Sequence, residues 1–86
     1  MTQSFESIRD IIADALRDMK LNPPTPLTSD LSFNKDLGVD SLGRAELIAR
    51  LERKFRIEVS DKDYQGLTTV GETENYIQSR LNKADA

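Results

Sequence analysis

The sequence predicts a small all-α bundle of three main helices and one short helix, with a long loop after the first helix. Apolar residues recur at spacings of three and four in three separate segments, which is the period of one helix face. Helix-start patterns precede the later segments, and a proline-rich stretch separates the first two. At 86 residues the chain has the length of one domain, so we expect a single domain over residues 1–86.

The first helix is predicted over residues 4–20. Apolar side chains at helical spacing form its expected buried face: Phe5, Ile8, Ile11, Ile12, Ala15, Leu16 and Met19. Thr2 or Ser4 can accept hydrogen bonds from the free N–H groups at its start. Asn22-Pro23-Pro24 should end it, because proline disfavours helical geometry in the preceding residue and donates no backbone hydrogen bond.

The connection over residues 21–39 is long for a compact domain. Connections of this length are usually functional or carry some structure of their own. Four apolar residues can hold it against the core, namely Leu27, Leu31, Phe33 and Leu37. Gly38, near its end, permits a backbone angle that other residues resist.

The second helix is predicted over residues 41–55, with Asp40 as its N-cap. Its apolar residues cover a wider arc than one core-facing stripe needs: Leu42, Ala45, Leu47, Ile48, Ala49, Leu51 and Phe55. We therefore expect this helix to touch the core, line a cavity and offer surface to partners. Gly43 costs roughly 1 kcal/mol of helix propensity relative to alanine, and the sequence gives no reason for it.

A short third helix is predicted over residues 61–65, ended near Gly66. Ser60 and Asp63 have the spacing of a capping box, with aspartate in place of the usual glutamate. The preceding residues 56–59 alternate in polarity but are too few to build a sheet.

The last helix is predicted over residues 70–82. Thr69 and Glu72 form a second capping-box pattern at its start. Its buried residues are expected to be Val70, Thr73, Tyr76, Ile77 and Leu81.

Composition excludes several kinds of chemistry. The chain has no cysteine and no histidine, so it offers no disulfide, no cysteine zinc site and no serine–histidine pair. We expect no catalytic residue and no metal site. The net charge of −3 argues against nucleic acid as a partner. No apolar run is long enough to cross a membrane and no signal segment is evident, so we expect a cytoplasmic monomer.

The stretch Gly38-Val39-Asp40-Ser41-Leu42, followed by Glu46-Leu47, resembles the attachment motif of the acyl carrier proteins. The resemblance covers nearly the whole chain, including residues 33–38, 55–59 and 67–71. It implies an acyl-carrier-like bundle in which the Ser41 hydroxyl is esterified with 4′-phosphopantetheine from coenzyme A, which makes the chain a phosphoprotein. Such a carrier is not an enzyme. Its implied partners are a phosphopantetheinyl transferase and the acyl-transferring and chain-extending enzymes of fatty-acid, lipid or polyketide biosynthesis.

The residues themselves are compatible with a phosphodiester at Ser41. Free backbone N–H groups and the positive end of the helix dipole favour an anion there by roughly 0.3–1 kcal/mol. A bare Asp-Ser pair is most often only a cap or turn, and the flanking pattern is what favours attachment. The resemblance gives Asp40 a second role beside capping, as a contact for the transferase and its metal ion.

The apolar residues have two interpretations. Eight of them are candidates for an acyl pocket of the kind the family uses: Phe33, Leu47, Ile48, Leu51, Val59, Leu67, Tyr76 and Ile77. For any one of them, an ordinary place in the core is the simpler interpretation. Each acyl methylene buried among them would contribute roughly 0.8 kcal/mol.

The second helix departs from the acidic helix of common fatty-acid carriers, since residues 40–58 hold five bases and four acids. Candidate docking residues are Leu42, Arg44, Glu46, Arg50, Arg53 and Asp61. The charges can be a solvated face with an i,i+4 pair between Glu46 and Arg50, or they can alter partner choice. The second interpretation predicts a specialised bacterial member that serves a dedicated lipid or secondary-metabolite enzyme set.

Three other functions are open to the same sequence. An aminoacyl or peptidyl carrier is the nearest, although such carriers more often show Gly-Gly-x-Ser before the same leucine. A nucleic-acid binder using the arginines of the second helix is disfavoured by the interleaved acids. An enzyme using Ser41 lacks an evident base, with a serine–lysine arrangement as the one formal route.

Overall fold

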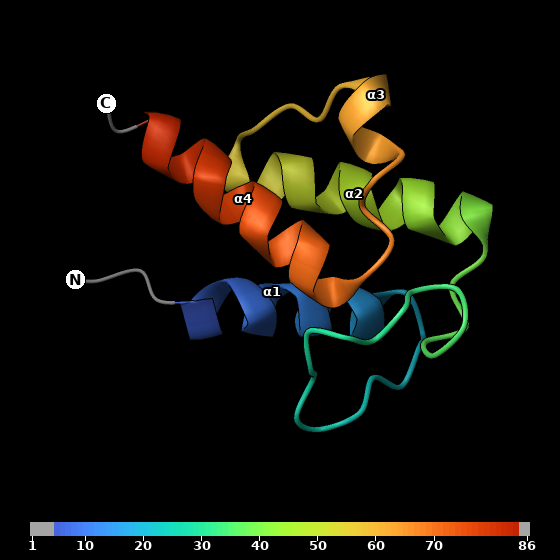
Figure 1. The fold of residues 1–86 in the computed structure, drawn as a ribbon. Helices are drawn as coiled ribbons and strands as arrows, with labels where there is room; N and C mark the ends of the chain where they lie inside the picture. The colour runs from blue at the N-terminus through green and yellow to red at the C-terminus, as the bar shows by residue number, and fades with distance from the viewer. Residues whose placement is uncertain (1–4, 85–86) are drawn as a thin grey trace.

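The computed structural model describes residues 5–84, with side chains from Ile8 to Asn82. This part of the chain folds into α1 (Phe5–Asp18), α2 (Ser41–Phe55), the short α3 (Asp61–Tyr64) and α4 (Val70–Ala84), as Figure 1 shows. The predicted all-α class, with three main helices and one short helix, is confirmed. The single domain over residues 1–86 stays a prediction. Within the described range, no helix has the length and apolar character needed to cross a membrane.

The helix bounds differ from the predicted ones mainly at the ends. α2 has the predicted bounds, whereas α1 ends two residues before Lys20, α3 ends one residue early and α4 continues two residues past Asn82. The predicted caps Thr2 and Ser4 lie outside the described residues.

The end of α1 is a Schellman motif and not a proline stop. Leu21 N–H donates to the Leu16 carbonyl at 3.0 Å, and Lys20 N–H donates to the Arg17 carbonyl at 2.9 Å. Lys20 takes the left-handed conformation that this motif requires, with φ of 68°. The helix therefore ends at Asp18, before the effect of Pro23 on its neighbour is reached.

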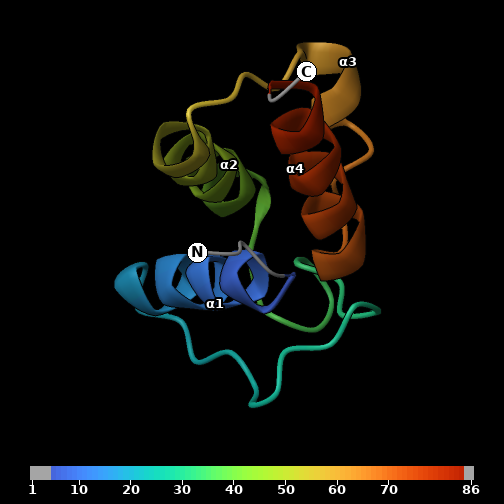
Figure 2. The same cartoon turned by 90° about the vertical axis from the view of Figure 1, so that its left-hand side faces the viewer.

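The core lies where α1 packs against both α2 and α4, an arrangement that is clearest in Figure 2. Its buried apolar residues are Ile8, Ile12, Ala15, Leu16, Leu27, Phe33, Val39, Leu47, Ile48, Leu51, Leu67, Val70 and Ile77. The set is almost wholly aliphatic. It contains four residues of the expected face of α1, whereas Ile11 and Met19 are half-buried, and it also contains residues of the long loop.

The long loop is fastened to the start of α4. Ser32 and Thr69 form an antiparallel bridge. Beside it, Phe33 N–H donates to the Thr68 carbonyl at 3.0 Å and Val70 N–H donates to the Leu31 carbonyl at 3.0 Å. Leu27 and Phe33 are buried, while Leu31 and Leu37 are half-buried. The expectation that apolar residues hold this loop to the core is confirmed.

A bidentate ion pair ties α1 to α4. Arg9 Nη2 and Nε donate to Glu74 Oε1 and Oε2 at 2.6 and 3.0 Å, and Glu74 is only 5% exposed. The same guanidinium donates to the Leu27 carbonyl at 3.1 Å and to Ser29 Oγ at 2.9 Å. The hydrogen bonds to Glu74 raise the pKa of Arg9. The sequence analysis did not predict this pair or the burial of Glu74.

The two capping boxes form to different extents. At α4, Glu72 N–H donates to Thr69 Oγ1 at 3.2 Å and Thr69 N–H donates to Glu72 Oε1 at 3.1 Å, so this box is complete. A hydrogen bond from the Thr68 hydroxyl is the main cause of the lowered pKa of Glu72. At α3, Ser60 accepts from Asp63 N–H at 3.1 Å, but the Asp63 carboxylate binds Tyr76 instead of completing the box.

Whether Gly71→Ala stabilises or destabilises the protein tests how closely Gly71 packs against Ser29. A Cβ here would lie 2.9 Å from Ser29 Cβ and 3.0 Å from the Ser29 carbonyl oxygen. Helix propensity alone would make Gly71→Ala stabilising by roughly 1 kcal/mol, whereas overpacking costs about 1–3 kcal/mol. We expect Gly71→Ala to lower the free energy of unfolding in urea by about 1 kcal/mol. Gly66→Ala is the control, because its Cβ would meet only the Asp63 carbonyl at 3.6 Å. A stabilised Gly71→Ala variant would contradict the close contact.

Candidate functional site

Ser41 is the first residue of α2, and its side chain is exposed. The chain reaches it through Gly38, whose positive φ of 69° confirms the special backbone angle expected there. Val39 is buried, at 3% exposure, and its N–H donates to the Phe33 carbonyl at 2.8 Å. The junction is thus anchored in the core one step before Asp40, while Ser41 stays at the surface.

Asp40 is the N-cap of α2, as predicted. Its Oδ1 accepts from Gly43 N–H at 2.7 Å, and its carbonyl accepts from Arg44 N–H at 2.8 Å. The reason for Gly43 is now visible. A Cβ at this position would lie 3.1 Å from Asp40 Oδ1 and 3.2 Å from Val39 Cγ1. The glycine makes room for the cap and for the anchoring valine at the same time.

The start of α2 suits an attached phosphodiester. Asp40 engages the N–H groups of Gly43 and Arg44, whereas those of Ser41 and Leu42 have no acceptor within the described part of the chain. The first turn carries no acidic residue. The Asp40 carboxylate is thus the acid at this helix end, and the free N–H groups of Ser41 and Leu42 remain to favour an anion beside it. The residues present fit a 4′-phosphopantetheine at Ser41.

Six of the eight predicted pocket residues lie together in the core: Phe33, Leu47, Ile48, Leu51, Leu67 and Ile77. Val59 and Tyr76 are half-buried and line a surface hollow of about 270 Å³ with charged neighbours such as Glu52 and Arg80. The eight predicted pocket residues thus lie either in the core or at its edge. Their role around an acyl chain stays a prediction.

No residue of α3 is buried, and polar contacts hold this helix to the rest of the protein. Arg44 Nη1 donates to the carbonyls of Tyr64 and Leu67 at 2.9 and 3.0 Å, and its guanidinium lies 4.3 Å from the centre of the Tyr64 ring. On the other side, Tyr76 Oη donates to Asp63 Oδ2 at 2.9 Å. Burial is the main cause of the raised pKa of Tyr76, with this hydrogen bond second.

Two charged side chains of α2 make contacts within the protein. Arg44, a docking candidate, holds α3 through Nη1, and its docking role stays a prediction. Glu52 Oε2 accepts from Val59 N–H at 2.8 Å, and Arg56 takes a left-handed C-cap conformation where the helix ends.

Of the other docking candidates, Leu42, Glu46 and Arg50 line one surface hollow, and Arg50 also lines a second one with Arg53. Leu42 is 80% exposed beside Ser41, and the predicted Glu46–Arg50 pair forms at 2.9 Å. Arg53 lies farther along α2, and Asp61 lies exposed at the start of α3. Their docking roles stay predictions.

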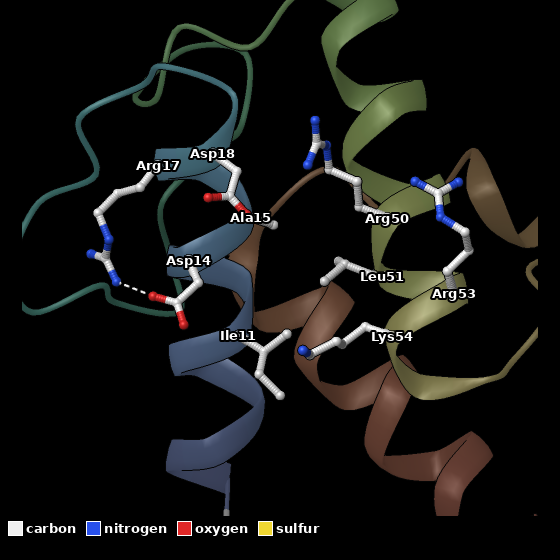
Figure 3. Close-up of a pocket in the computed structure, with 9 residues that line it drawn as sticks. All are labelled: Ile11, Asp14, Ala15, Arg17, Asp18, Arg50, Leu51, Arg53 and Lys54. Carbon is white, nitrogen blue, oxygen red and sulfur yellow. Dashed lines mark hydrogen bonds and ion pairs between the residues drawn. The ribbon is translucent and has the colours of Figure 1, made fainter.

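Arg50 and Arg53 open onto a groove between α1 and α2, shown in Figure 3. Its floor is apolar, with Ile11, Ala15 and Leu51. Its rims are charged, with Asp14, Arg17 and Asp18 on α1 and Arg50, Arg53 and Lys54 on α2. Sequence reasoning missed Lys54 and the acids of α1. The spacing of these charged residues indicated which of them share a face of their own helix. It did not show which faces of the two helices would pack together.

Two comparisons with known proteins agree with this geometry. The sequence profile of the family described as "Phosphopantetheine attachment site" matches residues 6–77. A relative from Saccharomyces cerevisiae (strain ATCC 204508 / S288c), the "Acyl carrier protein, mitochondrial", is 38% identical over 80 residues. The match covers 88% of this chain and 64% of the yeast protein, so the chain spans less than two thirds of that relative's length.

The cap on α2 can be tested apart from any function. Asp40→Ala removes the acceptor of the Gly43 N–H group and should lower the free energy of unfolding by about 1 kcal/mol. Asp40→Asn keeps an equally good capping oxygen and should stay within about 0.5 kcal/mol of the wild type. Chemical denaturation measures both. Equal losses in the two variants would show that the carboxylate charge, and not the cap, stabilises this helix.

Proposed function

The chain belongs to the phosphopantetheine attachment family, and we propose that it is an acyl carrier protein whose attachment residue is Ser41. In this proposal the 4′-phosphopantetheine arm on Ser41 holds acyl groups as thioesters and presents them to fatty-acid, lipid or polyketide biosynthetic enzymes. The observation that carries the proposal is the exposed Ser41 hydroxyl at the start of α2, on a junction anchored by Val39.

The chain's own residues have supporting roles in this proposal. The arm supplies the thiol that the sequence lacks. Val39 and Asp40 fix the position of Ser41, and the unengaged N–H groups of Ser41 and Leu42 stabilise the phosphodiester charge. Asp40 also contacts the transferase that adds the arm. The chain is a carrier and not a catalyst in this account.

The named relative favours acyl cargo over the aminoacyl or peptidyl cargo of the alternative carrier class, because the yeast protein is called an acyl carrier protein. A cytoplasmic location and a monomeric state remain part of the proposal. The name of the yeast protein places that relative in mitochondria, so cell fractionation is needed to test the location.

Attachment at Ser41 can be tested by mass. Incubated with coenzyme A and a promiscuous phosphopantetheinyl transferase, the wild type should gain the mass of one phosphopantetheine. Ser41→Ala should gain none. Ser79→Ala is the matched control, because Ser79 is exposed on α4 and should leave the modification intact. A gain that survives Ser41→Ala, or a wild type that gains nothing, contradicts the proposal.

The basic character of α2 supports a further part of the proposal, that this carrier serves a specialised set of enzymes. The residues that line the groove in Figure 3 include four bases and two acids, although the whole chain has a net charge of −3. A positively charged surface repels enzymes whose docking patches are also basic. Such surface charges act mainly on the rate at which the two proteins meet.

The loaded chain should therefore react more slowly with standard fatty-acid synthesis enzymes than an acidic carrier does, by roughly tenfold at low salt. Arg53→Glu combined with Lys54→Glu should recover part of this rate. Lys62→Glu combined with Arg80→Glu makes the same change in charge away from the groove and should recover less. Equal turnover of the wild type and the acidic carrier would refute specialised partner choice.

A further inference from the structure

A hollow of about 200 Å³ lies directly beside Ser41 and is separate from the groove of Figure 3. Three segments that are far apart in the sequence line it. Ser32 and Asn34 come from the long loop, residues 39–41 and Arg44 come from the junction with α2, and Thr68 comes from the turn before α4. Ser41 does not line the hollow on the other side of this junction, where Met19, Leu42 and Glu46 lie.

Backbone hydrogen bonds preform the walls of this hollow. Phe33 N–H donates to the Thr68 carbonyl at 3.0 Å, which joins the loop wall to the turn before α4. Val39 N–H donates to the Phe33 carbonyl at 2.8 Å, which joins the same wall to the junction. A side-chain hydrogen bond adds the third connection, because Arg44 Nη1 donates to the Leu67 carbonyl at 3.0 Å. A ligand here therefore meets walls that are already ordered.

The hollow offers polar groups that the protein itself does not use. Within the described residues, the Asn34 side chain has no hydrogen-bond partner, and the bonds of Arg44 to other residues all come from Nη1. The Nε–H and Nη2 groups of Arg44 are thus open donors, and the Asn34 amide offers both a donor and an acceptor. Buried Val39 adds an apolar contact between them.

We propose that this hollow is a binding site for the proximal part of the 4′-phosphopantetheine arm, comprising its phosphodiester and the adjoining branched hydroxy-amide. The inference rests on the proposed attachment at Ser41. Arg44 supplies a charge-assisted hydrogen bond to the phosphodiester, Asn34 binds the first amide, and the branched methyl groups pack on Val39. The volume is below the roughly 300–1,000 Å³ of pockets that enclose drug-sized ligands, so the distal thiol end stays outside.

The test uses the full-length holo-protein with an isotopically labelled arm, after intact mass has verified attachment. In the wild type, the first arm amide should have an NMR order parameter above about 0.6, and the second amide a value below it. Nuclear Overhauser effects should connect the arm methyl groups to Val39 and Thr68. Asn34→Ala should lower the order parameter of the first amide below about 0.6. Asn75→Ala, an exposed asparagine on α4, should leave it unchanged.

Other results would overturn the inference. A mobile first amide in the wild type, contacts from the arm to Met19 or Leu42 instead, or an unchanged order parameter in Asn34→Ala would each do so. If attachment succeeds and the arm is mobile, only this inference fails. If no mass is gained, the proposed function fails and the inference fails with it.

Discussion

The burial of Val39 is the constraint on which the rest of the site depends. Its side chain lies in the core and its N–H bonds to Phe33, so the chain enters α2 at a fixed point. A Cβ at Gly43 would press on Asp40 and Val39 at 3.1 and 3.2 Å, so the glycine leaves both residues in place. Ser41 follows this anchored pair and stands exposed at the positive end of the helix. The same anchoring forms one wall of the hollow beside it.

The main helices pack around the core, whereas the short helix α3 is held mainly by polar contacts. Helices α1 and α4 share the ion pair of half-buried Arg9 with buried Glu74 as well as apolar packing. In contrast, α3 buries no side chain and depends on hydrogen bonds from Arg44 and Tyr76. Few buried apolar contacts and exposed polar ones are the features of a region that opens at low free energy. An α3 that opens at low free energy is consistent with a protein proposed to admit an acyl chain.

Local patterns in the sequence predicted most of the fold. Helical spacing of apolar residues located the three main helices, and a capping pattern located α3. The caps Asp40 and Thr69 were found because capping depends on residues only three positions apart. The end of α1 was misplaced because a lysine, and not the expected glycine or asparagine, takes the left-handed position of a Schellman motif. Local spacing carries no information on that choice.

Tertiary contacts were the part that the sequence could not provide. The inward turn of Arg44 depends on where α3 docks, and the burial of Glu74 depends on Arg9, which lies 65 positions away. The explanation for Gly43 needed the positions of Val39 and Asp40 around it. At the site, the motif indicated Ser41 as the candidate attachment residue, but only the fold showed that Asn34 and Thr68 share a hollow with it.

Tandem mass spectrometry of the protein purified from its own cells tests the central claim most directly. The account predicts a phosphopantetheine whose fragment ions place it on Ser41, with Ser32, Ser60 and Ser79 unmodified. An arm located on any other residue, or protein that carries no arm while other carriers in the same cells are modified, would contradict the account.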